Sequence, residues 1–145
     1  MSISDAFESD LLKLIFNGTP IANIADNAVT APLTNLFIAL HTADPGEAGT
    51  QATSETTYTG YARVSVARTT GGWGVTGTSP TQAAPVANIT FGAWIAGAGT
   101  ITHWSIGVAA SGATKILLSG TVTPNIVLGA GVIPALSTST NVTLD

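Results

Sequence analysis

ITHWSIGVA, residues 101–109, is the stretch around which this 145-residue chain is expected to fold. Two series of side chains alternate along it, with the two-residue period of a β-strand. One series is Ile101, His103, Ser105 and Gly107, and the other is Thr102, Trp104, Ile106 and Val108. The small and polar run 110–113 predicts a hairpin connection into a second strand over Lys115–Val122. An antiparallel hairpin is therefore expected in the second half of the chain.

Working outward, other short apolar or alternating runs predict further strands. They are Leu36–His41, Tyr61–Thr69, Trp73–Thr78, Val86–Phe91, Ile126–Leu128 and Thr138–Leu144, with a possible short strand at Ile21 and Ile24. In Tyr61–Thr69, Ala62, Val64 and Val66 are expected on one face, and Arg63, Ser65 and Ala67 on the other. Because no helices alternate with these strands and no repeat is visible, the pattern predicts a mainly β fold, a single antiparallel β-sandwich of the jelly-roll kind.

One short N-terminal α-helix is expected before the strands. Phe7, Leu11, Leu14 and Ile15 recur at helical spacing, and Asn17-Gly18 provides a stop signal. The apolar stripe fits a helix that covers one side of a sheet, and it also fits an arm that docks on a neighbouring subunit. The predicted organisation is a helix or arm over residues 1–18 and a β-sandwich over 19–145, forming one compact domain overall.

Charge is distributed unevenly along the chain. From Thr69 to Leu144 the only charged side chain is Lys115, and the whole chain has four basic residues, eight acidic residues and no cysteine. So few cations disfavour nucleic-acid binding, and no run of about 20 apolar residues predicts a membrane-spanning helix. The acidic N-terminus does not resemble a signal peptide, so synthesis in a cytoplasm without export is expected. A neutral, hydroxyl-bearing domain favours close contact with other proteins.

His41, Asp44 and Glu47 lie within seven residues, a spacing that could suit a metal site or an acid–base cluster. The turn at Pro45-Gly46 prevents a helix from stacking them, and the alternating oxygen ligands of a calcium loop are missing. No metal site is predicted. Asp44 is instead expected to cap a turn through its own backbone, while His41 ends a strand.

Catalytic groups are also scarce. His103 lies within an apolar strand, and the chain has no Gly-x-Ser-x-Gly motif that would supply a nucleophile. His103 is therefore expected to be a partly buried residue with a satisfied hydrogen bond. The few carboxylates do not form a pair typical of glycoside cleavage. No catalytic residue and no cofactor is predicted, so a small hydrolase or metal enzyme is disfavoured.

Aromatic side chains are the remaining candidates for a binding surface. Trp94 lies in a run of small residues, 92–97, and fits either a loop anchor at a protein interface or a core side chain. The other tyrosines and tryptophans would suit a carbohydrate or receptor surface, or the core. The predicted interface residues are Phe7, Leu11, Asp44, Glu47 and Trp94.

Several blocks of the chain resemble small virion proteins of tailed bacteriophages, which are often labelled tail-fibre-like. The blocks are Ser4–Glu8 with Leu11–Phe16, Phe37–Gly49, Tyr58–Val64, Ile101–Gly107 and Leu118–Gly120. The resemblance covers most of the chain, and the run His-Thr-Ala-Asp-Pro-Gly-Glu-Ala-Gly at 41–49 is its most specific part. Some β-sandwich proteins of this size are capsid decoration or cement subunits. The resemblance implies a non-enzymatic structural role and carries over no catalytic residue.

Two positions in the virion remain open. A fibre shaft normally has repeated short motifs, whereas this chain has none, which favours a capsid decoration protein. Such a protein would bind the major capsid protein and copies of itself at the capsid surface, as a dimer or trimer, with affinity gained from many copies on a lattice. The alternative is a tail-fibre or collar adhesin that contacts a host receptor.

Overall fold

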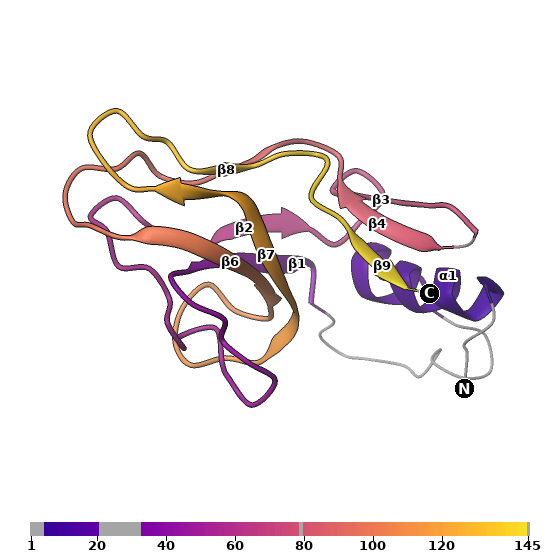
Figure 1. The fold of residues 1–145 in the computed structure, drawn as a ribbon. Helices are drawn as coiled ribbons and strands as arrows, with labels where there is room; N and C mark the ends of the chain where they lie inside the picture. The colour runs from indigo at the N-terminus through magenta and orange to yellow at the C-terminus, as the bar shows by residue number, and fades with distance from the viewer. Residues whose placement is uncertain (1–4, 21–32, 79, 145) are drawn as a thin grey trace. The chain divides into compact units, whose positions relative to one another are not determined.

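A computed structural model describes residues 5–20, 33–78 and 80–144 (Figure 1). Within these ranges, the helix α1 is followed directly by a short π-helix, η1, and then by nine strands. The elements are α1 (Asp5–Leu12), η1 (Lys13–Asn17), β1 (Asn35–His41), β2 (Val64–Ala67), β3 (Trp73–Thr76), β4 (Thr81–Pro85), β5 (Ile89–Thr90), β6 (Thr100–Gly107), β7 (Ile116–Val127), β8 (Ala135–Leu136) and β9 (Val142–Leu144). The mainly β class with one short helix near the N-terminus is confirmed.

Two compact units are formed by the described residues. The first draws on Met1–Asn35, Ala67–Asn88 and Leu136–Asp145, and the second on Leu36–Val66 and Ile89–Ala135. Each unit therefore combines segments that are distant in the sequence. The predicted division into an arm over 1–18 and a sandwich over 19–145 stays a prediction.

The second unit is built around a four-stranded sheet in the order β2-β1-β6-β7. Residues 101–107 of the stretch quoted first lie in β6, and Val108 and Ala109 follow it. β6 pairs antiparallel with β1 on one side and with β7 on the other. Leu40 lies opposite Trp104, and Trp104 lies opposite Gly120. A side chain at Gly120 would start 3.1 Å from the Trp104 indole, so the absence of a side chain there makes room for the ring.

β1 and β6 supply the core of this sheet because both are interior strands with long apolar side chains. Five of these side chains are fully buried or nearly so: Leu36, Ile38, Leu40, Ile101 and Ile106. β7 is an edge strand, and its side chains from Ile116 to Thr121 alternate between half-buried and exposed. That pattern is the two-residue period of a strand with one wet face.

In the first unit, a three-stranded sheet in the order β3-β4-β9 packs against the helix. Phe16 of η1 is fully buried, and its ring centroid lies 4.7 Å from that of Trp73 at the start of β3. The Asn17 side chain donates a hydrogen bond to the Trp73 carbonyl at 3.0 Å. The helical segment therefore packs on a sheet of its own unit through Leu12 and Phe16, which are buried, whereas Leu11, Leu14 and Ile15 of the predicted stripe are half-buried. Whether the predicted stripe also docks on a neighbouring subunit stays a prediction.

Arg68 completes the end of the helix. Its guanidinium donates hydrogen bonds to the carbonyls of Ile15, at 2.6 Å, and of Leu14. Gly18 ends the helix with φ of 66°, the left-handed conformation that favours glycine, as the stop signal predicted. A cation at the carbonyl end of a helix also interacts favourably with the helix dipole.

Several predicted strands differ from the observed ones. β4 and β8 were not predicted, and of Val86–Phe91 only the two residues of β5 form a strand. β4 reads Thr-Gln-Ala-Ala-Pro, which has little strand propensity of its own, and it forms because β3 and β9 pair with its two sides. The two strands expected over Lys115–Val122 and Ile126–Leu128 are one strand, β7, with an irregularity in its pairing to β6. The possible strand at Ile21 and Ile24 lies outside the described residues.

Within the described ranges, no helix has the length and apolar character needed to cross a membrane.

We expect Arg68→Ala to lower the free energy of unfolding by about 1.5–3 kcal/mol, because the helix-end carbonyls lose their charged donor. Lys13→Ala is the matched control: Lys13 is an exposed cation of the same helical segment, so its replacement should change stability by less than about 0.5 kcal/mol. Urea unfolding followed by circular dichroism measures both. Equal effects of the two substitutions would contradict the capping role of Arg68.

Candidate functional site

Arg63 is the centre of the most connected polar cluster of the second unit. The sequence predicts Arg63 on the same strand face as Ser65 and Ala67. This grouping is wrong: Arg63 precedes β2 and its side chain is only 2% exposed, whereas Ser65 and Ala67 are exposed. Further along, the predicted alternation is confirmed, since Val64 and Val66 are half-buried while Ser65 and Ala67 are exposed. A buried arginine needs partners for its charge and for all its N–H groups.

Glu55 is the charged partner of Arg63. The guanidinium donates two parallel hydrogen bonds of 2.7 Å, from Nε to Oε1 and from Nη2 to Oε2 of the carboxylate. Tyr61 donates a third hydrogen bond to Glu55 Oε1 at 2.8 Å and accepts one from the Leu40 backbone N–H at 3.1 Å. The bidentate geometry is the strongest form of this ion pair.

The remaining N–H groups of Arg63 bind two loops. Nη2 donates to the Gly112 carbonyl at 2.8 Å, and Nη1 donates to the Ala109 carbonyl at 3.1 Å. Nη1 also contacts Gln51 Oε1 and Thr114 Oγ1, each at 3.2 Å. The guanidinium thus joins the loop that follows β1 to the β6–β7 connection, and no N–H group is left over.

Gln51 extends this network under the sheet. Its Nε2 donates to the Phe37 carbonyl at 2.9 Å, and Thr114 donates to its Oε1 at 3.0 Å. A side chain at Gly107 would start 2.1 Å from Gln51 Cδ. Glycine is therefore required at the end of β6 so that this buried amide can reach across the strand.

The ion pair also affects the titration of its members. The hydrogen bonds to Glu55 raise the pKa of Arg63, so the guanidinium stays charged. Burial raises the pKa of Tyr61, so its phenol stays neutral and remains a donor to Glu55. The charge of Arg63 and the neutral phenol of Tyr61 both maintain the hydrogen bonds to Glu55.

His41 is the second buried polar group, at the end of β1 as predicted. It is fully buried, and its Nδ1 and Nε2 lie 2.8 Å from the Thr53 carbonyl and from Ser105 Oγ. Because a carbonyl only accepts, Nδ1 carries the proton and Nε2 accepts from Ser105. Burial lowers the pKa of His41. Ser105 is also fully buried, so this pair is a structural contact and not an accessible nucleophile.

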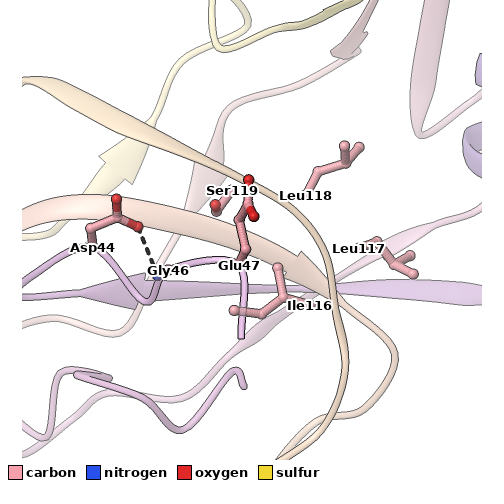
Figure 2. A pocket seen from close by; sticks show the side chains of 7 residues that line it. All are labelled: Asp44, Gly46, Glu47, Ile116, Leu117, Leu118 and Ser119. Atoms are coloured by element: carbon pink, nitrogen blue, oxygen red, sulfur yellow. Dashed lines mark hydrogen bonds between the residues drawn. The ribbon is translucent and has the colours of Figure 1, made fainter. Parts of the chain in front are cut away.

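His103 and Asp44 adopt the roles predicted for them. His103 is half-buried, and its Nδ1 lies 2.9 Å from Thr102 Oγ1. The Asp44 carboxylate accepts a hydrogen bond from the Gly46 N–H at 2.9 Å, and Gly46 has φ of 69°. Figure 2 shows this bond at the mouth of a hollow of about 420 Å³ between the 44–47 loop and the first residues of β7. In the part of the chain that the structure describes, no three side chains of metal-binding type gather into a site.

The five predicted interface residues are divided between the two units. Asp44 and Glu47 are exposed beside β7, and Trp94 is half-buried with its Nε1 donating to the Gly97 carbonyl at 3.1 Å. Leu11 is half-buried in α1 of the first unit, and Phe7 lies in the same helix. Their roles at an interface stay predictions.

The structure thus defines a mainly β protein with a buried Arg63–Glu55 ion pair in its second unit. The comparisons with known families say which kind. The chain matches the family described as "Podophage GP4 fiber I protein gp80" over residues 2–142, and it belongs to that family. It is a structural protein of a bacteriophage virion, as its resemblance indicated. A comparison with curated proteins gave no match.

Arg63→Met should lower the free energy of unfolding by about 3–5 kcal/mol, because Glu55 would remain in a poorly hydrated site without its counter-charge. Arg63→Lys should recover little, since an ammonium cannot make the two parallel bonds. Chemical unfolding measures both. Lys115→Met, which removes an exposed cation of the same unit, is the control and should change stability by less than about 0.5 kcal/mol.

The free energy of unfolding should fall as the pH drops below about 6.5, the pKa of an unperturbed histidine. Burial lowers the pKa of His41 in the folded state, so the unfolded state binds a proton at this histidine more readily. The free energy of unfolding therefore falls with pH until the pH reaches the lowered pKa of His41, and below that pH this contribution no longer changes. The slope should not exceed about 1.4 kcal/mol per pH unit for this one group. His41→Gln should remove this component, whereas His103→Gln should retain it; the reverse result would contradict the assignment.

Proposed function

We propose that this chain is a component of the podophage tail fibre that presents loops of its second unit outward from the virion. The observation that carries the proposal is the match to a fibre family over residues 2–142. The lack of repeats, which favoured a capsid decoration role, argues only against a repetitive shaft. Two compact units without repeats suit a terminal or connecting module of a fibre.

Self-association is part of the same proposal. β7 is the longest of the described strands and lies at the edge of its sheet. Charged side chains usually protect such an edge from pairing with another chain, and β7 contains none. Exposed apolar side chains of the same unit include Ile95, Val127 and Ile133, which are 66%, 68% and 58% exposed. Neutral edges and apolar side chains support contact with copies of this chain, as a dimer or trimer, because few charges need to be desolvated.

A capsid decoration protein is the second candidate. The same neutral surface would suit contact with the major capsid protein, and the compactness of the units is compatible with a cement subunit. An enzymatic role has no comparable support among the described residues, since the His41–Ser105 pair is fully buried and the Arg63 guanidinium is bound to Glu55 by two parallel hydrogen bonds.

Gold-labelled antibodies against the purified chain should mark the tail fibres of intact virions in electron micrographs. Pre-immune serum is the control for adventitious labelling. Label confined to the head would overturn the fibre proposal and support the decoration role. As a second measure, an excess of the free chain should reduce adsorption of the phage to its host if the chain carries the receptor contact.

A further inference from the structure

A second hollow, of about 370 Å³, lies in the second unit between the segment 55–63 and the β6–β7 connection. We call it the Tyr61 hollow. The residues used below line it: Glu55, Thr57, Tyr61, Ala62, Arg63 and Ser111. Its volume falls within the range of about 300–1,000 Å³ that is typical of small-ligand sites. Because the Arg63–Glu55 pair fixes both walls, the hollow is formed before any ligand arrives.

The charges in the hollow disfavour ionic ligands. Every N–H group of Arg63 already has an acceptor, so an anion would have to displace Glu55 or a backbone carbonyl. A cationic ligand would have to compete with Arg63 for a carboxylate that is held at two oxygens. Since either exchange would break a desolvated bidentate pair, an uncharged ligand fits best.

Hydrogen-bonding capacity nevertheless remains. Glu55 Oε2 accepts one hydrogen bond from the described residues, and the carboxylate is 17% exposed, so it has room for a further donor. Thr57 and Ser111 are exposed residues that line the same hollow, and each hydroxyl both donates and accepts. These groups match a ligand that carries several hydroxyls.

The hollow also has an apolar side. The Tyr61 ring is half-buried and fixed by its two hydrogen bonds, and its centroid lies 5.5 Å from that of Tyr58. The exposed methyl group of Ala62 lies beside it on the chain. A rigid aromatic edge with a methyl group gives C–H groups a surface to pack on, while the hydroxyls bind the polar rim of the ligand.

We propose that the Tyr61 hollow binds one ring of a neutral saccharide, with Glu55 and the hydroxyls of Thr57 and Ser111 bonding the sugar hydroxyls. The biological use of such a site, contact with a surface glycan, rests on the proposed fibre function. The chemistry of the site rests on the hollow alone. A single shallow site would bind weakly, and many copies on a virion would convert weak binding into firm attachment.

The test is a titration of the isotope-labelled full-length chain, followed by amide NMR. The probes are the methyl glycosides of glucose, galactose, mannose and N-acetylglucosamine. At least one of them should shift the amides of Thr57, Tyr61 and Ser111 in a saturable way. The double variant Thr57→Ala/Ser111→Ala should raise the dissociation constant of that glycoside about tenfold or more, because two hydrogen bonds to the ligand are lost.

Matched tryptophan substitutions separate the hollow from the rest of the surface. Ala62→Trp fills the hollow and should abolish the shifts, whereas Ala130→Trp, at an exposed alanine that does not line it, should retain them. The proposal is overturned if none of the four glycosides shifts these amides, if the shifts survive in Ala62→Trp, or if sodium sulfate produces the same shifts.

The two proposals fail in different ways. If a glycoside binds and the antibody labels only the head, the fibre function is wrong and the saccharide site is supported. If the antibody labels the fibres and no glycoside binds, the fibre function is supported and the saccharide site is wrong.

Discussion

The buried pair of Arg63 and Glu55 is the constraint on which the second unit depends. Loops after β1 and between β6 and β7 have little regular structure of their own, and neither disulfides nor metal ligands tie them down. One guanidinium binds both, because its fork of donors reaches a carboxylate, a side-chain amide and two backbone carbonyls. Burying this charge is costly, and only a complete set of partners offsets that cost.

The scarcity of charge makes this arrangement specific. Lys115 is the one charged side chain between Thr69 and Leu144, so the β6–β7 connection can meet Arg63 only through carbonyl and hydroxyl oxygens. No competing carboxylate lies in that part of the chain to draw the guanidinium away. In a charge-rich protein, a buried arginine could pair with several carboxylates. Here Glu55 is the carboxylate that Arg63 binds, and carbonyl oxygens bind its other N–H groups.

Local pattern explains what was predictable. β6, β1 and the helix carry strong periodicity, so their positions follow from the sequence, and the Asp44 turn follows from its own residues. Two features could not be predicted from local pattern, because each depends on partners far along the chain. β4 pairs with β9, and the Arg63 guanidinium is buried against residues 109–114. Strict alternation groups Arg63 with Ser65 and Ala67, and this grouping takes no account of a distant partner that can bury the guanidinium. A carboxylate eight residues earlier, Glu55, was the available signal for pairing.

The same scarcity of charge bears on assembly. A neutral surface cannot steer a partner from a distance, so association gains little from electrostatic attraction and is insensitive to salt. In exchange, the exposed threonines and small residues lose few hydration contacts when another neutral surface covers them. Individual contacts of that kind are weak, and they suit a protein held in many copies at fixed spacing, where each bound copy raises the effective concentration of the next. The neutral composition therefore supports the proposed self-association, in which copies of the chain are held together on a virion.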